Sequence, residues 1–225
     1  MIVTIHQANY FPYIGFFHKI NHSDIFVVQD DVKFDERVTN RNKIISSTGY
    51  TWLNIPILKG HKFLNINEVK INNSIKWRKT NWKKITSGYN NAEYFYLYKE
   101  YFKKLYQKEW EFIFDINFEG IKKVIEWLGI KTEVIKESEL NVRGTSTERL
   151  VNVCKAVGAD VYLSGVGGKN YINEKLFEKN NIKLKYQNYK SAAYTQNLSK
   201  VFIPDLSIID VLANMGPKSK ELLGN

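Results

Sequence analysis

Short apolar runs alternate with amphipathic segments at both ends of the chain. Ile2–Ile5 is a mostly apolar run, Ile25–Val28 is a continuous one, and a helical pattern near 14–20 lies between them. The alternation returns later, with strands expected at 133–135, 161–164 and 183–186 and helices at 147–157 and 173–180. Strand–helix–strand alternation predicts an α/β fold with a mostly parallel, Rossmann-like sheet flanked by helices.

The middle of the chain departs from this alternation. The segment "NKIISSTGYTWLNIPIL" predicts two strands about Ser47–Gly49, a β-hairpin. Helical patterns follow at 74–88, 92–108 and 118–128, and Gly129 is typical of a C-cap. We therefore expect one domain over 1–225 with a helical insertion at roughly 74–128. A short apolar helix at 207–214 is expected to dock on the core, with a second subunit as the alternative.

Composition places the chain among compact globular proteins. Apolar residues make up 44% and aromatic residues 14% of the sequence. The apolar runs are too short to span a bilayer, and the features of a secretory signal are missing. A single cysteine, Cys154, allows no internal disulfide and gives no metal-ligand spacing. We expect a cytoplasmic protein without a metal site.

The formal net charge of +10 raises the question of a nucleic-acid partner. The lysines are spread from Lys19 to Lys220, and none of the common nucleic-acid motifs is present. The densest basic stretch, "KWRKTNWKK" at 76–84, is expected to be a solvated helix face, with a phosphate- or membrane-facing helix as the alternative. The excess charge therefore favours small anionic substrates over nucleic acid.

Polar side chains follow the first two strands directly. His6 ends the first strand, and Asp31 follows the second. Because the carboxyl ends of parallel strands share one edge of a sheet, both are expected at one rim, where ligands bind. His6 is a candidate general base or hydrogen-bonding anchor, and a buried, satisfied imidazole is the alternative. Asp31 is a candidate proton acceptor or Mg²⁺ ligand, and a turn cap is the alternative.

Three further segments carry groups suited to anions and sugars. "NRNK" at 40–43 has a guanidinium that can grip a carboxylate or phosphate, and "GTSTERL" at 144–150 resembles a helix start with free amides. In "SGVGGKNYI" at 164–172, glycines let backbone N–H groups approach an anion. The alternatives are a polar loop at 40–43, helix capping at 144–150 and a tight strand-to-helix turn at 164–172. The candidate substrate-binding residues, including those beside His6, are Gln7, Asn9, Tyr10, Asn40, Arg41, Asn42, Ser146, Thr147, Ser164, Gly165, Gly167, Gly168, Lys169 and Tyr171.

Taken in order, several segments resemble the WbqC-like family. They are "HQANYFPYIGFFHKI", "DIFVVQDDVKF", "NRNKI", "WLNIPI", "GTSTERL", "GADVYLSGVGGKNYI", "YQNY" and "FIPDLSIIDVLANMGP". The resemblance implies a protein of bacterial surface-polysaccharide clusters, notably O-antigen clusters, and a glycine-transferring role is suggested for some members. It carries over no catalytic residues. The chain departs at Ala8, where the family usually has proline, and at Asn81, where a histidine is frequent.

A more distant likeness connects the first strand, loop and helix with nucleotidyltransferases and pantothenate synthetase. Their His-x-Gly-His signature would fall on Asn9–Pro12, where neither histidine is present. Nucleotidyl transfer through that motif is therefore in doubt, and an ATP-using enzyme of this kind is the weakest of three hypotheses.

The leading hypothesis is a transferase that joins a small acyl or aminoacyl group, glycyl being one candidate, to an amino sugar or a nucleotide-linked sugar. His6 or Asp31 would act as the base, and Arg41, Lys169 and the glycine amides would hold phosphates. Tyr10 and Tyr171 would stack on a sugar or base. The second hypothesis is a non-catalytic carbohydrate- or nucleotide-sugar-binding protein of the same pathway. The sequence leaves the cofactor and the oligomeric state open.

Overall fold

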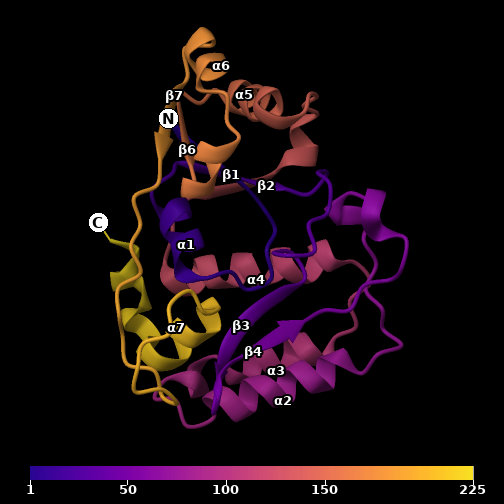
Figure 1. Ribbon diagram of the computed structural model, residues 1–225, viewed down its shortest axis with the longest axis vertical. Coiled ribbons are helices and arrows are strands. Elements are labelled where there is room, and N and C mark those ends of the chain that lie inside the picture. Colours follow the sequence, from indigo (N-terminus) through magenta and orange to yellow (C-terminus); the bar gives the residue numbers. More distant parts are fainter. Residues whose placement is uncertain (225) are drawn as a thin grey trace.

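A five-stranded parallel sheet forms one end of the molecule (Figure 1). The computed structural model describes residues 1–224. The strands lie in the order β5-β2-β1-β6-β7, and their bounds are β1 Ile2–Gln7, β2 Ile25–Gln29, β5 Glu133–Lys136, β6 Val161–Ser164 and β7 Lys183–Tyr186. The α/β fold with a parallel sheet, predicted from strand–helix alternation, is confirmed.

Helices cover both faces of this sheet. The helices α5 (Ser146–Ala156) and α6 (Glu174–Lys179) pack on one face, and α1 (Ile14–Asn21) and α4 (Ile113–Leu128) pack on the other. Along β2, alternate side chains enter opposite clusters, and all four residues of Ile25–Val28 are buried. The continuous apolar run therefore marks a strand that is covered on both sides.

The predicted hairpin forms a separate two-stranded antiparallel sheet. Its strands are β3 (Arg41–Ser46) and β4 (Gly49–Asn54), and Gly49 takes a positive φ of 110° at the turn. The helices α2 (Trp77–Tyr89) and α3 (Lys99–Gln107) pack beside it (Figure 1).

Most of the predicted helices match the observed ones to within three residues, and two differ by more. The helix expected at 92–108 is divided into a 3-10 turn, Phe95–Leu97, and α3. Here the Tyr94 N–H donates to the carbonyl of Ala213 instead of to a helical partner. The helix expected at 118–128 starts five residues earlier, because Ile113, Phe114 and Ile116 extend its buried face.

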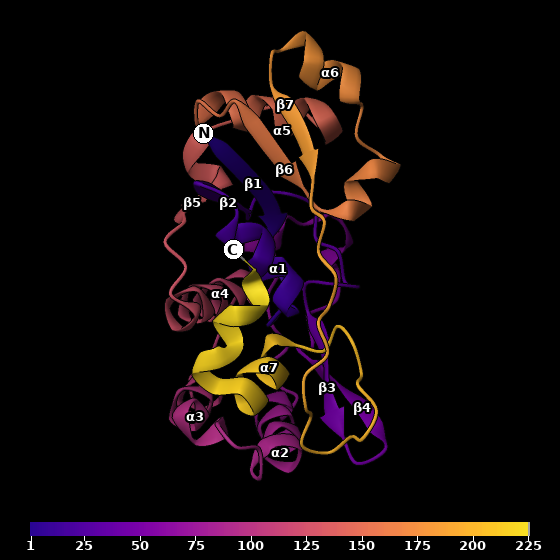
Figure 2. The ribbon, with the colours of Figure 1, turned by 90° about the vertical axis from the view of Figure 1, so that its left-hand side faces the viewer.

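One apolar cluster runs from the sheet to the far end of the molecule. It joins side chains of β2, α1 and α4 to those of the hairpin, α2, α3 and α7 (Ile208–Met215). Figure 2 shows α4 and α7 between the sheet and the α2–α3 end. The expectation that the C-terminal apolar helix docks on the core is confirmed. Among residues 1–224, no helix is both long enough and apolar enough to cross a bilayer.

The central strand separates from one neighbour toward its carboxyl end. Pairing of β1 with β2 extends over Val3–Gln7, whereas pairing of β1 with β6 is limited to Ile2 and Val3. Since β2 and β5 lie on one side of β1 and β6 and β7 on the other, the strand order reverses at this gap. In open α/β sheets, a ligand binds in the crevice outside the strand ends at such a switch point.

Candidate functional site

A cavity of about 230 Å³ opens at the switch point between β1 and β6. We call it the inner chamber. The end of β1, the loops after β1, β6 and β7, and α1 form its walls. Its lining residues are His6, Asn9, Tyr13, Phe16, Lys19, Gly165, Val166, Gly167, Gln187 and Tyr189.

A second cavity of about 310 Å³ adjoins the first and shares three of its residues, His6, Asn9 and Tyr13. We call it the outer chamber. The hairpin and the loop before it supply most of its wall. Its remaining lining residues are Pro12, Arg37, Val38, Arg41, Asn42, Lys43, Trp52 and Asp205. The two chambers therefore meet at one boundary made by the loop that follows β1.

Lys19 brings a buried ammonium group to the inner chamber. Its side chain is 3% exposed, and Nζ donates to the carbonyl oxygen of Ile5 at 3.4 Å. Burial lowers the pKa of Lys19 from 10.5 to about 7, and no carboxylate of residues 1–224 opposes that fall. A buried cation without an anionic partner lowers the stability of the fold unless a bound ligand supplies the opposite charge. The inner chamber is thus suited to an anion.

His6 lies at the boundary between the two chambers as a neutral imidazole. Burial, and then the charge of Lys19, lowers the pKa of His6 from 6.5 to about 3. Nδ1 is 3.1 Å from the carbonyl oxygen of Gln7, which selects the tautomer with the proton on Nδ1. Nε2 then carries the lone pair and can accept a hydrogen bond or a proton.

The loop after β1 is held by two side chains from distant elements. Phe11 has a positive φ of 40°, an uncommon backbone conformation for a residue of this size. Its carbonyl accepts from Asn42 Nδ2 at 2.6 Å and from Ser207 Oγ at 2.8 Å. This clamp fixes the loop that presents Asn9, whose Oδ1 is buried and unpartnered within residues 1–224. Asn9 therefore offers an acceptor to a ligand N–H or O–H.

The glycine segment after β6 contributes open backbone to the inner chamber. A Cβ placed on Gly165 or Gly167 would have no atom within 4 Å, so a ligand can approach this backbone closely. Gly168 behaves differently, because a Cβ there would lie 2.2 Å from Ser164 Oγ. Gly168 and Ser164 are both buried and shape the turn beneath the chamber.

Aromatic and cationic groups of the hairpin form the outer chamber. The guanidinium of Arg41 lies 5.0 Å from the centre of the Trp52 ring, and Trp52 is 40% exposed. Lys43 also lines this chamber and lies 5.2 Å from the ring of Tyr50, which is outside it. An exposed indole beside cations is suited to a sugar ring that carries negative charge.

The structure corrects the expectation that Asp31 is a free base. Its Oδ1 lies 2.6 Å from Arg149 Nη2, and it lines neither chamber. Arg149 also contacts the buried carboxylate of Glu137. The adjacent Asp30 accepts from the Ser138 N–H and Oγ at 3.0 and 2.6 Å, as a cap. Asp31 therefore fixes α5 against the strand ends.

Several other candidates also lie outside the chambers. Tyr10 is fully buried with its hydroxyl against that of Tyr106, which corrects the expectation that it stacks on a ligand. Asn40 donates to the carbonyl oxygen of Ile55, and Thr147 Oγ1 accepts from the Asn173 N–H, so both serve the fold. The remaining members of this group are Gln7, Ser146, Lys169 and Tyr171, and the last three are exposed.

Sequence reasoning missed six of the inner-chamber residues: Tyr13, Phe16, Lys19, Val166, Gln187 and Tyr189. For Lys19 a signal exists, because Phe16, Lys19 and Ile20 share the apolar face of a short helix. A lysine on such a face is a candidate buried cation. Gln187 follows β7 and donates to the carbonyl oxygen of Gly15 at 2.7 Å, a contact that only the fold creates.

The donor atoms do not suggest a protein-bound metal centre. Within the described part of the chain, no three His, Cys, Asp or Glu side chains are grouped so as to hold a metal ion. The cationic inner chamber instead suits a phosphate or another anionic group of a substrate or cofactor.

Comparisons with known proteins agree with the extent of this fold. A family model described as the WbqC-like protein family matches residues 7–222, which include every chamber residue except His6. Uncharacterized protein Rv1507c of Mycobacterium tuberculosis (strain ATCC 25618 / H37Rv) is 29% identical over 224 residues, covering 98% of this chain and 96% of that protein. No solved structure matches the chain.

Proposed function

This chain belongs to the WbqC-like protein family, and from that premise we propose that it is a transferase of bacterial surface-polysaccharide assembly. It transfers a small acyl or aminoacyl group, with glycyl as the first candidate, to an amino sugar or a nucleotide-linked amino sugar. The inner chamber takes the activated acyl donor, and the outer chamber takes the acceptor.

The observation that carries this proposal is the buried ammonium of Lys19 in a chamber bordered by the neutral imidazole of His6. An anionic leaving group bound at Lys19 supplies the negative charge that no protein carboxylate of residues 1–224 provides there. That bound anion also offsets the effect of Lys19 on His6, so the imidazole becomes more basic when the donor is present. Donor binding and base strength are thereby coupled.

The reaction balances as an amide-forming acyl transfer. The acceptor amine attacks the carbonyl carbon of the acyl donor, a C–N bond forms, and the bond from carbon to the leaving group breaks. His6 Nε2 receives the amine proton, and Lys19 with the open backbone at Gly165 and Gly167 stabilises the departing anion. Asn9 Oδ1 orients the amine by accepting a hydrogen bond from one of its N–H groups.

The outer chamber supports an acceptor that is a charged sugar. Trp52 offers a flat apolar face, and Arg41 and Lys43 offer positive charge beside it. This combination fits a pyranose ring linked to a phosphate or nucleoside diphosphate. Because the chambers meet at His6 and Asn9, the acceptor amine reaches the donor carbonyl at that boundary.

The test is an amide-formation assay followed by mass spectrometry. A glycyl phosphate ester and a glycyl thioester serve as donors, ATP with free glycine serves as a further arm, and UDP-linked amino sugars serve as acceptors. We expect the wild-type protein to form the N-glycyl product and His6→Ala to slow it at least about a hundredfold. Lys19→Met should mainly raise the donor KM, and Lys131→Met, which changes an exposed lysine near the opposite strand ends, should leave the rate unchanged.

A second candidate function is favoured by the low pKa of His6. At about 3, this pKa makes the free imidazole a weak base, as expected for a group that only accepts hydrogen bonds. The protein would then bind a nucleotide-linked sugar without changing it. Thermal stabilisation by UDP-sugars, with no product in any donor arm, would support this binding role and contradict the transferase.

A further inference from the structure

A basic pocket lies between α2 and α3, away from the two chambers. Its volume is about 470 Å³, within the range of small-molecule sites, and it shares no lining residue with either chamber. Four of its lining side chains are cationic: Lys76, Arg78, Lys79 and Lys103. No carboxylate among residues 1–224 lines it.

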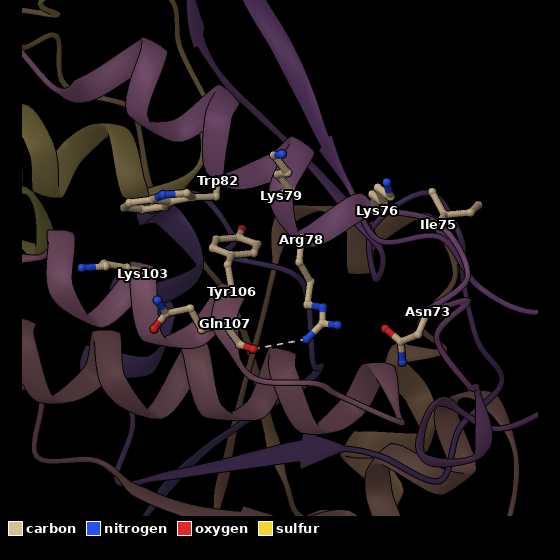
Figure 3. Close-up of a pocket in the computed structure, with 9 residues that line it drawn as sticks. All are labelled: Asn73, Ile75, Lys76, Arg78, Lys79, Trp82, Lys103, Tyr106 and Gln107. Carbon is tan, nitrogen blue, oxygen red and sulfur yellow. Dashed lines mark hydrogen bonds between the residues drawn. The ribbon is translucent and has the colours of Figure 1, made fainter.

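Two of these cations have counter-ions at the rim, and two have none. Arg78 reaches from α2 toward α3 (Figure 3), where it donates to the Gln107 carbonyl and to Glu109, each at 3.2 Å. Lys103 lies 3.8 Å from Glu100. Lys76 and Lys79 form no ion pair within residues 1–224. The pocket therefore keeps a net positive charge.

The position of these charges opposes local helix stability. Lys76 is the N-cap of α2, with Arg78 and Lys79 in its first turn, and that turn contains no acidic residue or capping side chain. The partial positive charge of a helix N-terminus disfavours cations there and favours anions. A local rule broken by three neighbouring residues is more typical of a functional site than of a solvated face.

Aromatic side chains complete the pocket wall. Trp82 from α2 and Tyr106 from α3 lie on the same side of it (Figure 3). Trp82 is half-buried, whereas Tyr106 is buried with its hydroxyl against Tyr10. A half-buried indole next to free ammonium groups is suited to a flat ring that carries a phosphate.

We propose that this pocket is a second ligand site, which binds a phosphate ester whose ring lies against Trp82. Lys76 and Lys79, the two cations without a counter-ion, hold the phosphate, and Arg78 stays fixed by its contacts with α3. The ring is a nucleobase or a sugar, and the experiment separates the two. The inference does not depend on the proposed transferase activity, because the two sites share no residue.

Calorimetric titration of the Lys19→Met, Trp52→Ala protein tests the proposal, since these changes remove the ammonium of the inner chamber and the indole of the outer chamber. AMP, glucose 1-phosphate, inorganic phosphate and adenosine are the probes. We expect AMP or glucose 1-phosphate to bind, adenosine not to bind, and inorganic phosphate to bind more weakly. Stronger binding of AMP than of glucose 1-phosphate identifies the ring as a nucleobase, and the reverse identifies it as a sugar.

Two matched double variants locate the binding. Lys76→Gln with Lys79→Gln should weaken binding at least about tenfold. Lys104→Gln with Lys108→Gln removes the same charge from exposed residues of the α3 region outside the pocket and should change affinity less than about twofold. Quenching of tryptophan fluorescence by the bound ligand should disappear in Trp82→Phe.

Three results would overturn the proposal. One is that neither phosphate ester binds at millimolar concentration. Another is an equal loss of affinity in the two double variants, which indicates unspecific attraction. The third is ligand quenching that persists in Trp82→Phe. Failure of the acyl-transfer assay alone would leave this site unaffected, because these titrations measure binding without turnover.

Discussion

At the scale of single residues, Lys19 shows how a site can oppose the stability of its own fold. Its ammonium is buried beside His6, and within residues 1–224 its one hydrogen bond is to the carbonyl of Ile5. Because its pKa falls from 10.5 to about 7 on folding, the charged form is destabilised in the native state. This cost is fully present below pH 7 and is lost as pH rises from about 7 to 10.5.

Lys19→Met removes this cost while keeping an unbranched side chain. We expect its free energy of unfolding at pH 6 to exceed that of the wild type by about 3 kcal/mol, after allowing for the lost hydrogen bond. The difference should shrink as pH approaches 10, because the folded-state lysine is then neutral and the pH is close to the unfolded-state pKa of 10.5. Urea denaturation at the two pH values measures it.

The matched control is Lys131→Met, which changes a lysine at an exposed position. Its unfolding free energy should stay within about 0.5 kcal/mol of wild type at both pH values. A Lys19→Met protein that is less stable than wild type at pH 6 would show that the ammonium has a stabilising partner and would remove the argument for an anion at this point.

Prediction from sequence was uneven at this scale. His6, Asn9, Arg41, Asn42, Gly165 and Gly167 line the chambers, because strand-end and glycine positions are visible locally. Tyr10 and Asp31 are not at the chambers, since their partners Tyr106 and Arg149 come from other helices. The residues next to Tyr10 and Asp31 in the sequence do not indicate that these side chains pair with partners far along the chain.

At the scale of elements, Arg149 fixes the start of α5 to two strand ends. It contacts Asp31 after β2 and Glu137 after β5, and Glu137 is fully buried. Burial raises the pKa of Glu137, while the charge of Arg149 opposes this rise. Removing the arginine would leave a buried carboxylate with uncompensated charge.

Arg149→Met should therefore lower the free energy of unfolding by about 3 kcal/mol at pH 8. The loss should be smaller at pH 5, because without Arg149 the pKa of Glu137 rises further and the carboxyl takes up a proton in the folded state. Arg143→Met, at an exposed position before α5, should differ from wild type by less than about 0.5 kcal/mol. A deficit for Arg149→Met that grows on acidification would contradict this account.

At the scale of the whole molecule, two apolar clusters are joined by the central strands. Val27 of β2 packs into the cluster under α5 and α6, and its neighbours Phe26 and Val28 pack into the large cluster that reaches α2 and α3. Neither cluster can lose this strand without exposing the other. Unfolding should therefore be cooperative across the molecule.

Natural probes report on the two clusters separately. The five tryptophans lie between Trp52 and Trp127, whereas Cys154 is the single cysteine and lies fully buried under the sheet. Burial raises the pKa of Cys154 to about 12, so the folded thiol is unreactive near neutral pH. In urea, tryptophan fluorescence and thiol labelling should give the same midpoint. If the Cys154 thiol is labelled at lower urea concentration than the fluorescence changes, the sheet end opens independently. The Cys154→Ala protein, which has no cysteine, gives the background of the labelling assay.

The fold itself was more predictable than its assembly. Apolar runs and helical periodicity located the strands, the hairpin and the C-terminal helix, because these signals are local. The order β5-β2-β1-β6-β7 and the approach of the hairpin to the strand ends arise from contacts between segments far apart in sequence. Periodicity contains no information about such contacts.

The walls of the inner and outer chambers come from different parts of the chain. The inner wall belongs to the sheet and α1, and the outer wall belongs largely to a hairpin with its own hydrogen-bond ladder. If the protein is the transferase proposed above, changes to the exposed hairpin side chains Arg41 and Trp52 would alter which acceptor binds without touching the inner chamber. A transferase built in this way could diversify its products by varying one surface hairpin.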